Sequence, residues 1–218
     1  MKSRQIQEIE FKWGVRSTSD FELFFNKLPK YAASISSAKT IQIKDYYLDT
    51  KSRFFGQCRT SCRLRNSGNR WELTLKSQSA LKNGLASRQE RTLPLPPFKD
   101  TLKALQYCQK ELSLMTHSQP LEILFEIHNQ RTVRIITLPD QTQTELSFDE
   151  AQICRGTHRI PLNEIELEFI RGDDKSFGNF IRKMTRSTKI PPAHISKVFT
   201  ALSKKLENSE LFSQKDNQ

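Results

Sequence analysis

Hydrophobic and polar residues alternate with a period of two in nine short segments, which is the pattern of half-buried β-strands. These predicted strands are Gln5–Trp13, Ile41–Leu48, Thr60–Asn66, Arg70–Lys76, Arg88–Leu95, Leu121–Ile127, Gln130–Leu138, Glu145–Ile153 and Asn163–Ile170. Residues 66–69 and 138–141, which include Gly68 and Pro139, have the composition of tight turns between neighbouring strands. The pattern therefore indicates a large antiparallel sheet or a barrel.

Four other segments have the apolar spacing of amphipathic helices, namely Ser19–Leu28, Thr101–Met115, Ser176–Met184 and Ile195–Leu206. Each apolar stripe must be buried, and the predicted sheet is the only large surface available to bury it. No internal repeat, low-complexity tract or linker divides the chain. We therefore expect a single domain over residues 1–207 and a flexible C-terminal tail over residues 208–218.

Charged residues gather on one face of several predicted strands. In the first strand the period of two places Glu8, Glu10 and Lys12 on one face and apolar residues on the other. One such strand is typical of any half-exposed sheet, but the same separation recurs further along the chain. The recurring sets are Arg63 with Arg65, Lys76 with Thr74 and Glu72, and Glu164 with Glu166 and Glu168.

If helices cover the apolar faces, the charged faces must point the other way, which in a closed barrel is into the lumen. Burying unpaired charges costs several kcal/mol each, so the interior needs compensating ligands. Paired carboxylates suit hard cations such as Mg²⁺, whereas Arg and Lys suit phosphate oxygens. Together they predict a site for a metal-bound polyphosphate.

Composition narrows the class of partner. The chain is 36% hydrophobic and 27% charged, which is globular composition, and its net charge of +11 favours anionic partners. The four cysteines, Cys58, Cys62, Cys108 and Cys154, form no CxxC pair, so neither a zinc site nor a disulfide framework is indicated. No apolar run of about 18 residues and no signal-peptide pattern occurs, so we expect a cytoplasmic protein that does not interact with membranes.

The charged strands resemble the CYTH superfamily, the triphosphate tunnel metalloenzymes. The N-terminal Glu8-x-Glu10-x-Lys12 matches the family's ExExK signature. Further elements follow in family order: Tyr46–Thr50, Arg63-Leu64-Arg65, Trp71–Lys76, Arg88-Gln89-Glu90, Arg131, Asp149, Glu164–Glu168 and Ser196-Lys197. The resemblance runs from the first predicted strand nearly to the last predicted helix.

The resemblance implies an α+β fold in which a closed eight-stranded antiparallel β-barrel forms a tunnel with helices packed on its outside. Eight strands against nine candidates means that one prediction is wrong, and Leu121–Leu138 is the region we doubt. There, Arg131 and Arg134 fall on opposite faces, and the choice of Arg131 as the lumenal arginine rests on the motif.

The resemblance also implies roles for individual residues. Glu8 and Glu10 would bind Mg²⁺ or Mn²⁺ with a carboxylate of the late acidic strand, while Glu90, Asp149 and Glu164 would hold a second ion or orient water. Lys76, Glu90 and Asp149 are the candidate catalytic residues. The candidate metal ligands are Glu8, Glu10, Glu90, Asp149, Glu164 and Glu166, and the candidate phosphate-binding residues are Lys12, Arg63, Arg65, Lys76, Arg131 and Lys197.

The implied activity is metal-dependent hydrolysis of a terminal phosphoanhydride, with inorganic triphosphate as the preferred substrate. Family members also include thiamine and nucleoside triphosphatases and class IV-type adenylate cyclases, and these remain open alternatives. A basic module that binds polyphosphate or RNA without chemistry would explain the net charge but not the carboxylates. We therefore expect a triphosphate-containing small molecule as the partner rather than nucleic acid, and the oligomeric state stays open.

Overall fold

The computed structural model describes residues 3–77, 83–193 and 201–202. The strands are β1 (Arg4–Gly14), β2 (Ser34–Ile35), β3 (Lys39–Thr50), β4 (Thr60–Ser67), β5 (Arg70–Ser77), β6 (Leu85–Leu95), β7 (Leu121–Thr137), β8 (Gln143–Arg155) and β9 (His158–Arg171). The helices are α1 (Thr18–Lys27), the 3-10 turn η1 (Leu28–Lys30), α2 (Phe54–Gln57), α3 (Thr101–Leu112) and α4 (Asp174–Thr188).

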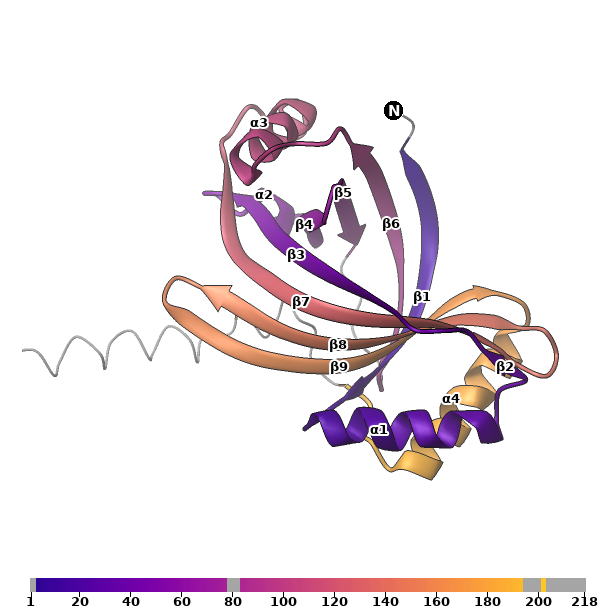
Figure 1. Cartoon of the computed structure of the whole chain (residues 1–218). Helices are drawn as coiled ribbons and strands as arrows, with labels where there is room; N and C mark the ends of the chain where they lie inside the picture. Colours follow the sequence, from indigo (N-terminus) through magenta and orange to yellow (C-terminus); the bar gives the residue numbers. More distant parts are fainter. Residues whose placement is uncertain (1–2, 78–82, 194–200, 203–218) are drawn as a thin grey trace, which may run out of the picture.

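Eight strands close into an antiparallel barrel in the order β7-β3-β4-β5-β6-β1-β9-β8, and pairing of β8 with β7 completes the circle (Figure 1). The predicted eight-stranded barrel with outer helices is therefore confirmed. The two candidates within Leu121–Leu138 are one continuous strand, β7. The two-residue strand β2, which the alternation did not predict, pairs with the end of β7.

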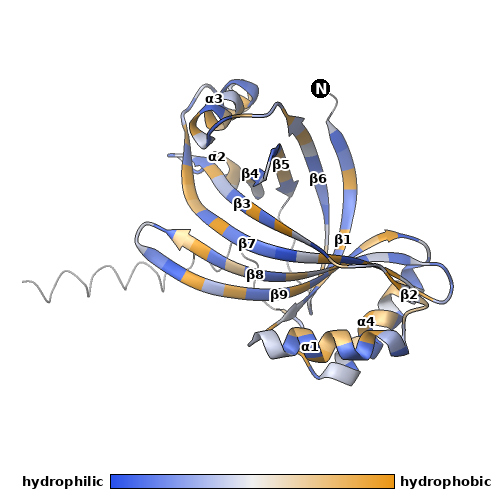
Figure 2. Cartoon of the chain, in the orientation of Figure 1, coloured by the Kyte–Doolittle hydropathy of each residue, from blue (hydrophilic) through white to orange (hydrophobic). Residues whose placement is uncertain are grey.

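The strands alternate between polar and apolar residues, as Figure 2 shows by their blue and orange bands. Both predicted turns are present. The β4–β5 hairpin closes at the pair Ser67 and Arg70, and Gly68 adopts φ +70° in its two-residue loop, a conformation that favours glycine. In the β7–β8 turn, the backbone N–H of Gln141 donates to the carbonyl of Leu138 at 2.9 Å.

Helices α1 and α4 lie side by side and cover the outer face of the barrel near β1, β8 and β9 (Figure 1). Trp13 is fully buried there, packs edge-on against Phe24 of α1, and donates from Nε1 to Thr185 of α4 at 2.8 Å. Leu146 and Ile165 complete this core from the barrel side. The apolar stripes of both helices therefore bury the outward-facing residues of these strands, as predicted.

Helix α3 covers the outer faces of β3, β4 and β5, where Ala104 and Cys108 pack against Leu64 and Trp71. The short helix α2 was not predicted. Of the predicted helix Ile195–Leu206, only residues 201 and 202 are described, and they are helical. The predicted tail at 208–218 lies outside the described residues. Across the described ranges, none of the helices has the length and apolar character needed to cross a membrane.

Candidate active site

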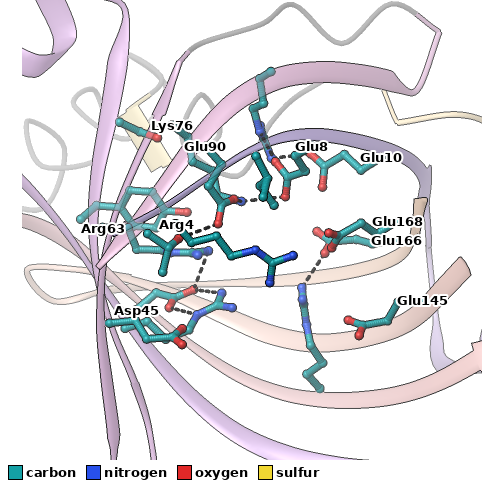
Figure 3. A pocket seen from close by; sticks show the side chains of 18 of the residues that line it. Arg4, Glu8, Glu10, Asp45, Arg63, Lys76, Glu90, Glu145, Glu166 and Glu168 are labelled. Atoms are coloured by element: carbon teal, nitrogen blue, oxygen red, sulfur yellow. Dashed lines mark hydrogen bonds and ion pairs between the residues drawn. The ribbon is translucent and has the colours of Figure 1, made fainter. Parts of the chain in front are cut away.

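The barrel encloses a cavity of about 440 Å³ with a predominantly charged wall, to which all eight barrel strands contribute (Figure 3). The charged lining residues are Arg4, Glu8, Glu10, Lys12, Asp45, Arg63, Arg65, Glu72, Lys76, Arg88, Glu90, Arg131, Glu145, Glu166 and Glu168. Towards one end of the barrel the inward residues of β3, β7 and β8 are apolar, and Tyr47, Ile127 and Ile153 form a buried cluster with Ala201. The lumen therefore combines a charged compartment with an apolar end.

Strand β1 carries three charged residues of the predicted site on its inward face, as its alternation predicts. Glu8, Glu10 and Lys12 are all less than a tenth exposed and line the cavity. Lys12 lies opposite Glu166 in the β1–β9 register, and its Nζ donates to Glu166 Oε1 at 2.6 Å. The same Nζ lies 3.4 Å from Glu10 and 4.0 Å from Glu164, so one ammonium group is surrounded by three carboxylates.

Lys76 and Arg88 connect β5 and β6 to β1. Lys76 Nζ lies 2.8 Å from Glu8 and 2.5 Å from Glu90, while Arg88 contacts Glu8 at 2.6 Å and Glu10 at 2.5 Å. Burial opposes ionisation of Glu8, but the charges of Lys76 and Arg88 outweigh it and lower its pKa to about 2. Burial, reinforced by the nearby Arg63 charge, lowers the pKa of Lys76 below its usual value. These carboxylates and bases therefore form one coupled network.

Arg63 and Arg65 extend from β4 into the lumen beside Asp45 of β3. Arg65 forms a two-pronged bridge, donating from Nε and Nη2 to the two oxygens of Asp45 at 2.7 Å each. Arg63 is held more loosely, with Nη1 3.8 Å from Asp45, and its buried Nε has no hydrogen-bond partner among the described residues. A buried guanidinium donor without an acceptor is costly, so this wall is suited to an anion.

Asp149, Glu164 and Glu166 form a buried carboxylate cluster on β8 and β9, with an oxygen of each within 4.8 Å of the others. Asp149 accepts two hydrogen bonds from Arg131, at 2.7 and 2.6 Å, and Arg131 also donates to Glu166 at 2.5 Å. Burial acts against the charge on Arg131, but Glu166 and Asp149 raise its pKa above the usual value. The cluster offers the oxygen ligands that Mg²⁺ and Mn²⁺ prefer.

Carboxylates outnumber bases in the lumen. Among the described residues, eight carboxylates and seven cationic side chains line the cavity, and Asp149 and Glu164 lie buried beside it. Burial, together with Glu8 and Glu145, raises the pKa of Glu168 to about 7. The lumen therefore has the charge balance of a site that accepts additional cations, and its residues fit a divalent metal ion.

The structure brings almost all of the predicted site residues together in or beside one cavity: Glu8, Glu10, Lys12, Arg63, Arg65, Lys76, Glu90, Arg131, Asp149, Glu164 and Glu166. Lys197 lies outside the described residues. The predicted grouping of Glu90 with Asp149 and Glu164 is different in the structure, where Glu90 pairs with Lys76 and the cluster contains Glu166 instead.

Sequence reasoning missed four charged lumenal residues: Arg4, Asp45, Arg88 and Glu145. Asp45 lies directly before the Tyr46–Thr50 motif, and its inward orientation could have been read from its period-two spacing to Tyr47, which also lines the cavity. Arg88 stood within the R-x-E motif but received no role, although it has the same parity as Glu90. In both cases the signal was the strand alternation.

Comparison with known proteins agrees with this architecture. The family model for the CYTH domain matches residues 7–198, so the chain belongs to the CYTH family. The match covers the barrel strands except the first residues of β1, together with the outer helices α1, α3 and α4.

An inorganic triphosphatase of Haemophilus influenzae is 27% identical over 190 residues, which cover 84% of this chain and 51% of that protein. The chain therefore spans about half the length of this curated relative. A solved Hippeastrum protein, described as a candidate adenylyl cyclase with a dominant triphosphatase activity, is 18% identical with a TM-score of 0.63, covering 90% of this chain and 95% of that one. A candidate adenylate cyclase from Vibrio parahaemolyticus is 16% identical with a TM-score of 0.57, covering 90% and 98%. These two structures share the fold.

Proposed function

We propose that the protein hydrolyses the terminal phosphoanhydride bond of a triphosphate in a reaction that depends on a divalent metal ion, with inorganic triphosphate as the substrate. The proposal rests on one observation: a wall with arginines on β4 faces a wall with carboxylates on β9 across the same lumen. Strand β4, with Arg63, is four positions from β9, with Glu166, in either direction around the eight-stranded barrel. Figure 3 accordingly shows Arg63 and Asp45 on one side of the cavity and Glu166, Glu168 and Glu145 on the other.

The basic residues are assigned to the phosphate chain. Arg63 offers a buried donor that lacks an acceptor among the described residues, and Arg65 offers the part of its guanidinium that faces away from Asp45. Lys12, Lys76 and Arg131 carry further positive charge into the same cavity. Arg65 would keep its bridge to Asp45 and add phosphate oxygens as partners, whereas phosphate oxygens would replace carboxylate oxygens around the other bases. The buried charges would then stay compensated when substrate enters.

The metal is assigned to the acidic side of the lumen. Asp149, Glu164 and Glu166 would hold Mg²⁺ or Mn²⁺ together with Glu8 and Glu10 of β1. The packing of Lys12 Nζ among Glu10, Glu164 and Glu166 supports the assignment, because this ammonium already marks a position where a cation is stable. When bound, the metal neutralises charge on the phosphate oxygens and lowers the pKa of a bound water.

Catalysis by the chain is assigned mainly to positioning and electrostatics. Lys76 stabilises charge that develops on the terminal phosphoryl group, while Glu90 and Asp149 orient the attacking water. The water oxygen forms a new bond to the terminal phosphorus and the bridging P–O bond breaks. Pyrophosphate leaves with the bridging oxygen, and the water gives up one proton, which is released with the phosphate products. The 2.5 Å contact between Lys76 and Glu90 supports this division, because it places a cation and a carboxylate side by side in the cavity.

The aromatic content of the lumen supports inorganic triphosphate over nucleotides and thiamine triphosphate. Tyr47 is the one aromatic residue among the described residues that line the cavity, and its ring already stacks on Phe125 at a centroid distance of 4.5 Å. The described lining therefore offers no second aromatic surface for a base or a thiazole ring. The Haemophilus influenzae relative, an inorganic triphosphatase, supports the same choice.

Phosphate release tests the proposal directly. Purified protein is incubated with inorganic triphosphate, ATP, GTP or thiamine triphosphate in Mg²⁺, Mn²⁺ or Ca²⁺, and phosphate is measured with malachite green. We expect the highest kcat/KM for inorganic triphosphate, with Mg²⁺ or Mn²⁺ required and EDTA abolishing release. A higher kcat/KM for another substrate would overturn the substrate assignment. RNA retention without phosphate release from any substrate would overturn the enzymatic assignment.

A further inference from the structure

Asp45 is a buried carboxylate on the wall assigned to the phosphate chain. It is 5% exposed and lies opposite Arg65 in the β3–β4 register, so both side chains point into the lumen. Both of its oxygens accept from Arg65 at 2.7 Å, and Oδ2 lies 3.8 Å from Nη1 of Arg63. Its charge also acts on Arg131, since Asp45 contributes to the raised pKa of that guanidinium. One carboxylate therefore interacts with three arginines.

The negative charge of Asp45 repels a bound polyanion. Compensation of the arginine charges is therefore not a sufficient reason for a carboxylate at this position. The geometry of the bridge accounts for it better. Because Asp45 contacts Nε and Nη2 together, it fixes the plane of the Arg65 guanidinium and directs the remaining donor, Nη1, away from β3. An arginine held in this way loses less conformational freedom when it binds phosphate.

We propose that Asp45 is a positioning residue for substrate binding, which holds Arg65 firmly and Arg63 loosely in the orientation that receives phosphate oxygens. The inference rests on the proposed function. In this role Asp45 does not contact the substrate. Asp45 affects substrate affinity only through Arg63 and Arg65. Arg65 keeps its bridge to Asp45 when substrate binds, whereas Arg63 gains hydrogen bonds to the phosphate that its own surroundings do not supply.

Two variants distinguish a role of Asp45 in orienting the arginines from a role in neutralising their charge. Asp45→Asn has the same shape but lacks the charge, and Asp45→Glu keeps the charge but moves it by one methylene. Inorganic triphosphate in EDTA is titrated into each protein by calorimetry, which measures binding without turnover. We expect both variants to bind about tenfold more weakly than wild type, because a charge-assisted double hydrogen bond is lost or misplaced. A residue that only neutralised the wall would give tighter binding in Asp45→Asn and unchanged binding in Asp45→Glu, and either result overturns the proposal.

Asp49→Asn is the matched control. Asp49 is a buried carboxylate on the same strand, but it accepts from the backbone N–H groups of Phe55 and Gly56 rather than from an arginine. We expect this variant to melt at a lower temperature and to bind triphosphate as wild type does. Weakened binding in Asp49→Asn equal to that in Asp45→Asn would show a general effect of losing a buried carboxylate and would overturn the proposal.

A double-mutant cycle tests whether Asp45 acts through Arg65. Lysine at position 65 cannot form the two-pronged bridge, so Asp45→Asn should add little to the loss already caused by Arg65→Lys. Additive losses of triphosphate affinity in the double variant would contradict the inference. Melting curves of all four proteins show whether a single variant is less stable, so a folding defect can be distinguished from a loss of binding. Wild type that neither binds nor hydrolyses triphosphate would refute the proposed function itself. Wild type that does both, with unaltered Asp45 variants, would refute only the role of Asp45.

Discussion

At the scale of single residues, Arg63 is informative because its position costs stability in the absence of a ligand. Its side chain is 12% exposed, its Nε has no hydrogen-bond partner among the described residues, and its ion contact with Asp45 is 3.8 Å long. Arg63→Met keeps most of the apolar stem and removes this charge. We expect the melting temperature of the ligand-free variant to equal or exceed that of wild type.

Triphosphate should stabilise the same variant less than it stabilises wild type. Triphosphate at 100 times its Kd stabilises a protein by about 2.7 kcal/mol, which corresponds to roughly 5–10 °C for a chain of this size. Arg63→Met should lose at least half of this shift, as measured by calorimetric melting with and without inorganic triphosphate. Arg70→Met, which removes an exposed arginine from the adjoining hairpin, is the control and should keep the full shift. A full shift in Arg63→Met would show that Arg63 does not bind the anion.

Substitution of Lys76 or Glu90 should reduce activity but leave the fold intact. Alanine at either position should lower kcat by a hundredfold or more, equivalent to about 3 kcal/mol of transition-state stabilisation, without unfolding the chain. Phosphate release gives the rate and circular dichroism monitors the fold. Gln89→Ala is the control, because Gln89 precedes Glu90 on β6 but is exposed on the outer face. Turnover at the wild-type rate in Lys76→Ala or Glu90→Ala would reject the role assigned to that residue.

At the scale of secondary-structure elements, Asp49 explains why the short helix α2 forms after β3. Its carboxylate accepts from the backbone N–H of Phe55 at 2.9 Å and of Gly56 at 3.1 Å. Phe55 is buried, so its N–H would be a buried donor without an acceptor if Asp49 were absent. Asp49→Ala should destabilise the protein by about 2–3 kcal/mol. Urea denaturation measures the change. Asp100→Ala, which removes the exposed N-cap of α3, is expected to cost about 1 kcal/mol, and an equal or larger cost there would contradict this account.

The barrel strands were predictable because each carries its own alternation. The period of two correctly identified the inward faces of β1, β4 and β9, and therefore residues such as Glu10, Arg65 and Glu166. Strand β7 was divided wrongly because the polar residues 128–132 interrupt its apolar alternation. Asn129 is in fact buried and opposite Ile43 within a continuous strand. Strand β2 has only two residues, too few for any period to appear.

The ion pairs were not predictable because they depend on closure of the barrel. Lys12 and Glu166 are 154 residues apart in sequence and become direct neighbours only when β1 pairs with β9. Alternation gives the face of a residue but not its partner across strands, so the contacts of Lys76 with Glu8 and Glu90 could not be predicted from it. Alternation could have placed Asp45 on the inward face, but its two-pronged bridge to Arg65 depends on the pairing of β3 with β4.

At the scale of the whole molecule, the charged lumen links global stability to ligands. Its residues come from all eight barrel strands, so a cation bound between them restrains strands that are distant in sequence. A ligand that binds only the folded state raises the free energy of unfolding according to its concentration and affinity. Because carboxylates outnumber bases among the described lumenal residues, a divalent cation alone should stabilise the protein before any phosphate is added.

Glu164→Gln tests this expectation without relying on activity. Glutamine keeps the shape of Glu164 but removes one charge from the cluster with Asp149 and Glu166, and Glu164 lies 4.0 Å from Lys12, farther than Glu166 does. Mn²⁺ titrated calorimetrically into wild type should bind and raise its melting temperature, and EDTA should reverse both effects. The variant should bind Mn²⁺ at least tenfold more weakly, because a charged oxygen ligand is lost. Glu150→Gln, which alters an exposed carboxylate beside Asp149, should bind as wild type does. Equal Mn²⁺ affinity in Glu164→Gln and wild type would remove Glu164 from the metal site.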